Sequence, residues 1–219
     1  MILIADNVAR VRERIVSTCA RSGRRPEEIT LVAVTKNRPR EQIEEVIKSG
    51  ITDIGENKVQ EALLKFGLRP SINFHMVGHL QTNKAKDAVR IFELIHSVDS
   101  LRLAEEIDKQ AGKINKIQNV LLEIKTSPEA TKFGIIPQEA PGIFKKVLGL
   151  RNIKVRGLMT IASLVDNPEK SRPYFRVLKE LSDNMGRLEI LSMGMSDDFE
   201  VAIEEGATMV RIGRAIFDN

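Results

Sequence analysis

The feature that most constrains the fold is a regular alternation of short apolar runs with longer amphipathic stretches. After an N-terminal helical pattern, which we expect Asn7 to cap and which ends near Arg21, the alternation repeats eight times. The apolar runs predict strands at 31–35, 52–55, 73–77, 94–98, 120–125, 153–159, 188–192 and 209–212. Regular strand–helix alternation produces parallel strands joined by right-handed crossovers.

Eight such units within 219 residues, with no linker rich in Pro, Gly or Ser, predict a single domain over residues 1–219. The expected architecture is α/β, a (β/α)8 barrel of the TIM type with an extra N-terminal helix. An open doubly wound sheet is the alternative, and it usually carries a glycine-rich phosphate loop after its first strand. Here the first strand is followed by Lys36-Asn37-Arg38-Pro39, which contains no glycine, so the barrel is favoured.

Composition narrows the classes of function. Hydrophobic residues make up 42% of the chain and charged residues 29%, which is ordinary for a globular protein. No apolar run approaches the ~20 residues needed to span a bilayer, and the first residues lack the features of an export signal. The single cysteine, Cys19, cannot form an internal disulfide, which fits a reducing compartment. We therefore expect a cytoplasmic protein without a membrane partner.

The net charge of +4 invites comparison with nucleic-acid-binding proteins. The basic residues are, however, interleaved with acidic ones, and the chain has neither a lysine-rich arm nor an aromatic platform for stacking bases. We expect a slightly basic, solvated surface and no nucleic-acid partner. No heptad pattern or long unpaired strand edge indicates an interface, so a monomer is expected.

The active site of a (β/α)8 barrel lies at the carboxyl ends of its strands, and the first strand here ends at Lys36. Many lysines at such positions simply extend into solvent. A lysine amine held against apolar walls can instead attack a carbonyl carbon and form a Schiff base. The first strand alone leaves both interpretations open.

The segments after the seventh and eighth predicted strands are rich in small residues. They are Ser192-Met193-Gly194-Met195-Ser196 and Arg211-Ile212-Gly213-Arg214. Loops at these positions are where such barrels bind phosphate, through backbone N–H groups that glycine allows to approach closely. Ser196 also suits an ordinary helix cap. A lysine for an aldehyde together with a phosphate cup fits pyridoxal 5′-phosphate, although a phosphosugar aldolase needs the same two parts.

Arg211 is placed where it could face the barrel mouth. A guanidinium opposite a pyridine nitrogen cannot accept a proton, so it keeps such a ring neutral. The alternative is an interior arginine paired with Glu123 or Asp99.

The histidines His75, His79 and His96 show no spacing typical of metal ligands, so no metal site is expected. His75 falls in the middle of a strand and is expected to be structural. His79 lies at a strand end, where it could contact a ligand.

Six segments, taken in chain order, carry the characteristic residues of the predicted strand ends. They are Val32-Ala33-Val34-Thr35-Lys36, Gly55-Glu56-Asn57-Lys58-Val59-Gln60-Glu61, the run from His75 to Lys84, Gly157-Leu158-Met159-Thr160-Ile161, the run from Leu191 to Asp198, and the run from Val210 to Phe217. Together they resemble the YggS/PROSC family, the pyridoxal phosphate homeostasis proteins. The resemblance covers nearly the whole chain.

The resemblance implies a barrel like the N-terminal domain of alanine racemase, with Lys36 holding pyridoxal 5′-phosphate as an internal aldimine. Arg211 matches the residue that faces the pyridine nitrogen. The residues that match the phosphate-binding loops are Ser192, Gly194, Ser196, Gly213 and Arg214, and those that match positions lining the pocket are Asn57, His79 and Met159. Arg214 departs from the pattern, because many relatives carry a small hydroxyl residue there.

The implied function is intracellular homeostasis of the cofactor and its delivery to apo-enzymes, with an influence on amino-acid and keto-acid pools. No catalytic residue is assigned, because a racemase needs a second base across its substrate, usually from a further domain or subunit. The only tyrosine, Tyr174, lies in a helical pattern and is expected on the outside of the barrel. The alternative is a slow amino-acid racemase, or another enzyme that depends on the same cofactor, which uses Lys36 alone or together with an unseen partner.

Overall fold

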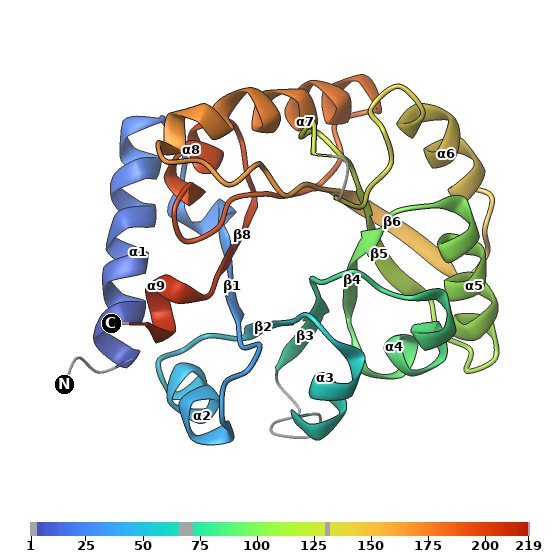
Figure 1. The fold of residues 1–219 in the computed structure, drawn as a ribbon, viewed down its shortest axis with the longest axis horizontal. Helices are drawn as coiled ribbons and strands as arrows, with labels where there is room; N and C mark the ends of the chain where they lie inside the picture. The colour runs from blue at the N-terminus through green and yellow to red at the C-terminus, as the bar shows by residue number, and fades with distance from the viewer. Residues whose placement is uncertain (1–3, 66–71, 130–131, 219) are drawn as a thin grey trace.

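The computed structural model describes residues 4–65, 72–129 and 132–218. A closed barrel of parallel strands forms its centre, in which each strand pairs with its neighbours in sequence and the last pairs with the first (Figure 1). The strands are β1 (Thr30–Val34), β2 (Asp53–Glu56), β3 (Asn73–Met76), β4 (Leu94–Val98), β5 (Gln118–Glu123), β6 (Ile153–Met159), β7 (Ile190–Ser192) and β8 (Met209–Ile212). The predicted (β/α)8 barrel is confirmed.

Helices surround this barrel on the outside (Figure 1). They are α1 (Ile4–Arg21), α2 (Arg40–Lys48), α3 (Val59–Lys65), α4 (Ala85–Ile91), α5 (Leu101–Gly112), α6 (Ala140–Val147), α7 (Arg172–Asn184), α8 (Phe199–Glu204) and α9 (Arg214–Phe217), with 3-10 turns at Pro26–Glu28, Thr82–Lys84 and Pro168–Ser171. The extra N-terminal helix, α1, packs on α2 and on the last two helices of the chain, α8 and α9.

The prediction that Asn7 caps the first helix is wrong. The helix begins at Ile4, and Asn7 lies one turn inside it. The Asn7 side chain is buried, and its Nδ2 atom donates a hydrogen bond of 2.9 Å to the carbonyl oxygen of Ile216. The asparagine therefore ties α1 to α9 instead of terminating its own helix.

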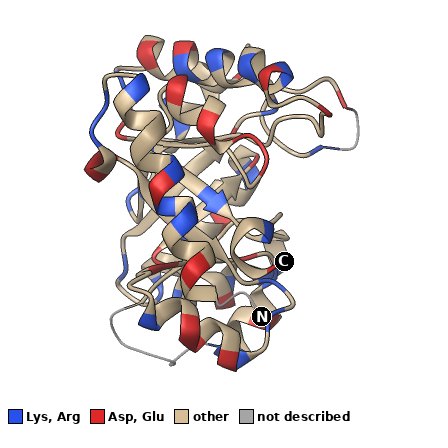
Figure 2. Ribbon diagram, turned by 90° about the vertical axis from the view of Figure 1, so that its left-hand side faces the viewer, with Lys and Arg blue, Asp and Glu red and all other residues tan. Residues whose placement is uncertain are grey.

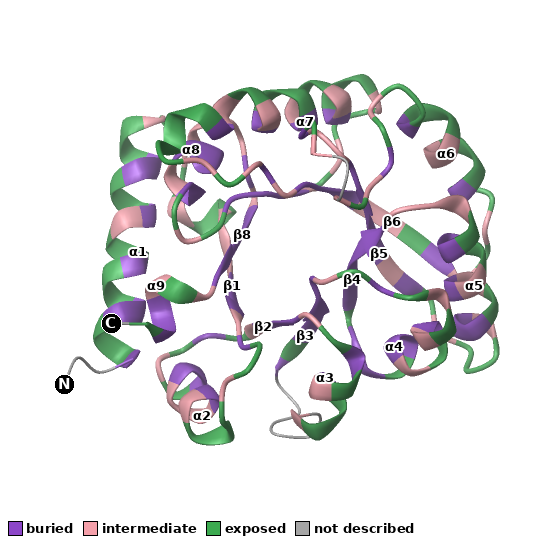
Figure 3. Ribbon diagram, viewed as in Figure 1, coloured by how far each residue is buried: buried purple, intermediate pink, exposed green. Residues whose placement is uncertain are grey.

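Successive side chains of a strand point to opposite faces of the sheet, so the apolar side chains form two cores, one inside the barrel and one outside it. Ala33 packs with the helices, whereas Val32 next to it belongs to a small cluster inside the barrel. The members of this inner cluster are Val32, Leu94, Leu121, Met159 and Met209. The much larger outer core lies between strands and helices, where the buried parts of the ribbon face each other (Figure 3). Tyr174 packs against this outer core, as expected. The inner cluster fills part of the barrel interior below its mouth.

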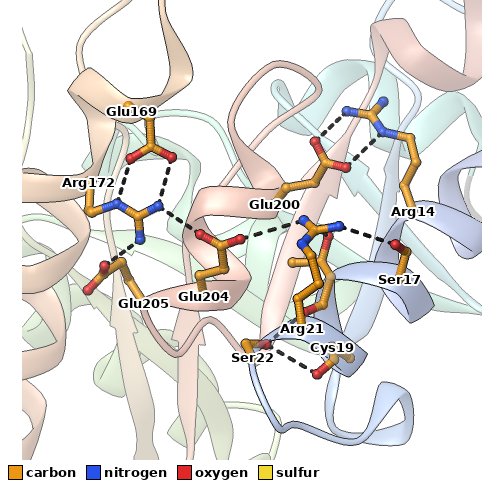
Figure 4. Close-up of polar contacts among 11 residues, drawn as sticks. Arg14, Ser17, Cys19, Arg21, Ser22, Glu169, Arg172, Glu200, Glu204 and Glu205 are labelled. Atoms are coloured by element: carbon orange, nitrogen blue, oxygen red, sulfur yellow. Dashed lines mark hydrogen bonds and ion pairs between the residues drawn. The ribbon is translucent and has the colours of Figure 1, made fainter.

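A group of ion pairs joins helices α1, α7 and α8 (Figure 4). Arg172, at the start of α7, contacts Glu169 at 2.7 Å, Glu204 at 2.7 Å and Glu205 at 2.6 Å. Glu204 is in turn 3.5 Å from Arg21 of α1. These contacts link α7, α8 and α1 through side chains.

Charged residues of both signs alternate along the helices on the face shown in Figure 2. This arrangement agrees with the solvated surface expected from the sequence. In the part of the chain that the structure describes, no helix is long and apolar enough to cross a membrane.

Candidate functional site

Lys36 lies at the carboxyl-terminal rim of the barrel, two residues beyond the end of β1. Because side chains alternate along a strand, Lys36 follows the inward-facing positions Val32 and Val34. Its side chain is exposed, so its stem is not held against apolar walls, which was one of the two interpretations that the sequence left open. The exposure arises because β1 ends at Val34 and Lys36 belongs to a turn, followed by Asn37 with a φ of 57°. The amine is therefore open to solvent at the mouth.

The backbone on either side of Lys36 is held by buried groups. Lys65 of α3 donates hydrogen bonds of 2.7 Å to the carbonyl oxygen of Thr35 and to Oε1 of Glu56. The Thr35 hydroxyl donates to the same carboxylate oxygen. Burial raises the pKa of Glu56, against the lowering effect of Lys65 and Thr35. Strand, helix and turn are thus fastened together beneath the exposed amine.

The ends of β2 and β3 approach each other closely at the mouth. A Cβ atom at Gly78 would lie 2.4 Å from the carbonyl oxygen of Asn57, so glycine is required there. The next residue, His79, has its Nδ1 atom 3.2 Å from Oδ2 of Asp99. Its ring stacks on that of Phe133, with centroids 3.6 Å apart. Asn57 and His79 are therefore both at the mouth, and His79 is held in one orientation.

A cavity of about 180 Å³ opens next to His79. Its lining includes His79, Glu123, Lys125, Ser127 and Phe133. Burial, with a further contribution from Asp99, raises the pKa of Glu123 to about 7, although Arg211 acts in the opposite direction. The cavity thus contains a carboxyl group that changes charge near neutral pH.

Hydrogen bonds join the loop after β7 to the end of β8 and to the start of α9. Ser196 Oγ accepts from the backbone N–H of Ala215 at 3.1 Å, and the N–H of Arg211 donates to the carbonyl oxygen of Gly194 at 3.0 Å. Gly194 has a φ of +93°, which favours glycine. The hydroxyl of Ser196 therefore already serves the start of α9, whereas the N-cap position of α8, the helix that follows Ser196, is occupied by Asp198.

Gly213 and Arg214, which are neighbours after β8, face different surroundings. Arg214 forms an ion pair with Asp197, and both side chains are exposed. At Gly213 an added Cβ would lie 3.5 Å from the carbonyl oxygen of Val34 and 3.6 Å from its Cβ. The missing side chain of Gly213 therefore keeps space open beside the strand that leads to Lys36.

Arg211 is buried inside the barrel. Its NH1 atom donates to Ser192 Oγ at 2.7 Å and its NH2 atom to the carbonyl oxygen of Thr160 at 2.9 Å. Burial lowers the pKa of Arg211 to about 10, against the raising effect of Asp198 and Glu123, so the guanidinium is a cation at neutral pH. Its hydrogen bonds thus go to Ser192 and Thr160, while Glu123 acts on it through charge.

Two of the residues assigned from the sequence lie deeper than the rest. The hydroxyl of Ser192 is bonded to Arg211 instead of facing the loop amides. Met159 belongs to the inner apolar cluster. Both contribute to the floor of the mouth.

Sequence reasoning did not anticipate the contacts that link Asp53, His75 and His96 inside the barrel. The available signal was alternation, because all three occupy inward positions of their strands. Among the residues that the structure describes, no group of three or more His, Cys, Asp or Glu side chains is arranged to hold a metal ion.

Comparison with known proteins adds to this geometry. The model of the alanine racemase N-terminal domain family matches residues 4–218. The pyridoxal phosphate homeostasis protein of Aquifex aeolicus (strain VF5) is 46% identical over 219 residues, covering 97% of this chain and 96% of that protein. The structure of PipY from Synechococcus elongatus PCC7942 with pyridoxal phosphate bound has a TM-score of 0.84 and 34% identity, covering 98% of this chain and 99% of that one. An alanine racemase from Clostridium difficile 630 shares the fold alone, with a TM-score of 0.77, 17% identity, and coverage of 98% of this chain and 57% of that one.

Fold and family match together define a barrel of the alanine racemase N-terminal type, with a lysine at the end of its first strand. Within this class, the chain belongs to the family of the pyridoxal phosphate homeostasis proteins. The resemblance inferred from the sequence motifs is confirmed.

The residues at the mouth fit pyridoxal 5′-phosphate. An accessible amine at Lys36 suits its aldehyde, and the cation of Arg211 suits a ring nitrogen that accepts a hydrogen bond. The space that a Cβ would take at Gly213 lies between the loop and β1, where a phosphate could meet backbone N–H groups.

Proposed function

We propose that this protein binds pyridoxal 5′-phosphate at the barrel mouth, holds it as a Schiff base on Lys36, and supplies it to apo-enzymes inside the cell. The observation that carries the proposal is that Lys36, Arg211 and the linked loops after β7 and β8 share one end of the barrel. The name of the Aquifex aeolicus relative and the PipY structure with bound cofactor support it.

Each group has a defined task. The amine of Lys36 condenses with the aldehyde carbon of the ligand, which forms one C=N bond and releases one water molecule. Backbone N–H groups near Gly213 and Gly194 donate to the phosphate. Arg211 donates a hydrogen bond to the ring nitrogen, and because a guanidinium cannot accept a proton, that nitrogen stays unprotonated. A neutral ring is a weak electron sink, which suits storage better than catalysis.

The exposure of Lys36 also favours a carrier over an enzyme. Enzymes of this chemistry exclude water from the reacting atoms. At an open mouth, water or an incoming amine reaches the Schiff base, so the cofactor can be released to other proteins. Amino-acid and keto-acid pools then respond through the enzymes that receive it. We therefore assign no catalytic residue.

The test is reduction of the loaded protein with borohydride, followed by mass mapping of the modified lysine. We expect a reducible absorbance band and a label on Lys36, with Lys36→Ala unlabelled and Lys48→Ala, which alters an exposed lysine of α2, labelled as in the wild type. A label elsewhere, or none, contradicts the proposal. Incubating the loaded protein with L-alanine in D₂O separates carrier from racemase, because a carrier incorporates no deuterium at the α-carbon.

A further inference from the structure

A continuous line of polar side chains crosses the interior of the barrel from the mouth to its opposite end. Ser192 Oγ lies 2.7 Å from Arg211 NH1 and 3.0 Å from His96 Nδ1. The Nε2 atom of His96 is 2.9 Å from Nδ1 of His75, whose Nε2 atom is 3.0 Å from Oδ1 of Asp53. We call this line the interior relay. It joins β8, β7, β4, β3 and β2.

The two ends of the interior relay lie at different ends of the barrel. Arg211 is near the carboxyl end of β8, beside the mouth. Asp53 is the first residue of β2 and borders a groove formed by the starts of the strands, together with Thr30 and Thr52. The relay thus connects the floor of the mouth to the amino-terminal face of the barrel.

Hydrogen-bond chemistry fixes the direction of the whole line, starting from Arg211. A guanidinium only donates, so Ser192 Oγ accepts from it. Among the described residues, the other recorded partner of this hydroxyl is His96 Nδ1, so the Ser192 proton is satisfied only if His96 Nδ1 accepts it. His96 then carries its proton on Nε2 and donates to Nδ1 of His75.

The opposite end agrees with this direction. The Asp53 carboxylate only accepts, so His75 donates to it from Nε2, and a neutral His75 ring then has Nδ1 free to accept from His96. Hydrogen bonds from His75, from Thr52 at 2.7 Å and from Asn73 at 3.2 Å keep the pKa of Asp53 below its usual value despite burial. Burial, with the nearby charge of Arg211, holds the pKa of His96 well below its ordinary value, so a neutral ring is favoured there.

The direction of the hydrogen bonds along the interior relay matters for Arg211. Among the contacts recorded for the described residues, no carboxylate touches its guanidinium. The hydroxyl of Ser192 can present either a lone pair or its proton to Arg211. His96 accepts that proton and so keeps the lone pair on the guanidinium. His96 is itself held by His75, and His75 by Asp53.

We propose that Asp53, His75 and His96 are positioning residues that aim the Arg211 guanidinium at the ligand through a single, one-directional line of hydrogen bonds. The proposal rests on the function proposed above for the contact between Arg211 and the ligand. It places a determinant of cofactor binding at the amino-terminal end of the barrel. Asp53 lies there, so it does not itself contact a ligand bound at the mouth.

The first test determines which ring nitrogens of His75 and His96 carry protons, in the absence of any ligand. In ¹⁵N spectra of imidazole nitrogens at neutral pH, the wild-type protein should show both His75 and His96 as neutral rings protonated at Nε2. With three histidines in the chain, a His79→Gln variant completes the assignment. A proton on Nδ1 of either ring, or a doubly protonated ring, overturns the proposed order.

The second test measures affinity for pyridoxine 5′-phosphate, which has the ring nitrogen and phosphate but no aldehyde and so reports on binding without the Schiff base. Asp53→Leu and His96→Phe should each weaken binding about tenfold, the scale of one hydrogen bond to a charged group. Asp53→Asn keeps an acceptor oxygen and should restore both the affinity and the Nε2–H signals. Thr52→Val, which removes a donor from outside the relay, should leave the affinity unchanged.

The outcomes separate this proposal from the function on which it rests. A folded Asp53→Leu variant that binds pyridoxine 5′-phosphate like the wild type overturns the positioning role. Should Asp53→Leu fail to fold, the Asn variant and the wild-type tautomers still decide the matter. Wild-type protein with the expected tautomers but no reducible label on Lys36 would instead refute the proposed cofactor function.

Discussion

The Nζ atom of Lys65 lies 2.7 Å from Oε1 of Glu56, whose side chain is fully buried. The same amine bonds to the carbonyl oxygen of Thr35, the residue immediately before Lys36. One cation therefore compensates a buried carboxylate and fixes the backbone that presents the candidate nucleophile. Stability and the position of the mouth depend on the same contact.

The first prediction concerns this ion pair. Lys65→Met should lower the free energy of unfolding by about 3–5 kcal/mol, because it leaves Glu56 as an uncompensated buried charge. Urea denaturation of both proteins measures the difference. Lys58→Met is the matched control, since Lys58 pairs with Glu61 at the surface, and it should cost less than about 1 kcal/mol. Equal losses in the two variants would contradict this account.

The second prediction concerns the loop after β8. Gly213→Ala should retain affinity for pyridoxine 5′-phosphate, because the added Cβ meets Val34 at ordinary contact distance. Gly213→Val adds further atoms in the same space and should weaken binding about tenfold or more by blocking approach to the backbone. Binding of pyridoxine, which lacks the phosphate, should change little in either variant. An equal loss for both ligands would show that the loop does not hold the phosphate.

The third prediction concerns the charge of Glu123. Its pKa is about 7 in the folded protein and near 4.5 when unfolded, so the native state binds the extra proton between these values. Its contribution to stability is therefore complete below about pH 4.5 and is lost as the pH rises through about 7. Relative to Glu123→Gln, the wild-type protein should lose about 3 kcal/mol between pH 4.5 and pH 8. Parallel stability profiles of the two proteins in denaturant titrations would refute the elevated pKa.

The fourth prediction concerns the ion pairs in Figure 4. Arg172→Met should lower the free energy of unfolding by about 2 kcal/mol, since Arg172 joins three glutamates from a half-buried position. Arg176→Met removes a more exposed arginine whose ion pair among the described residues is with Glu205, and it should cost less than about 1 kcal/mol. The Arg172 effect should shrink in high salt, because salt screens partly exposed charges. A larger loss for Arg176→Met would contradict this ranking.

Several elements were predictable because they depend on neighbours in sequence. The boundaries of β4, β6 and β8 agree with the apolar runs, and Ser100 caps α5 by accepting from the N–H of Leu103. Asn7 misled the prediction because capping residues also occur inside helices when a distant group binds them, here the carbonyl oxygen of Ile216. Lys36 is exposed because strand length, set by pairing with β2 and β8, ended β1 at Val34.

The eight strand–helix units, the lysine after the first strand and the glycines of the last two loops can be recognised in the amino-acid sequence, because periodicity and turn chemistry are local properties. Which inward side chains meet depends on how the barrel closes. Asp53, His75, His96, Ser192 and Arg211 come from five strands, and their contacts depend on the register with which the barrel closes. Local pattern shows which face a residue takes, whereas closure of β1 on β8 brings those faces together across the interior.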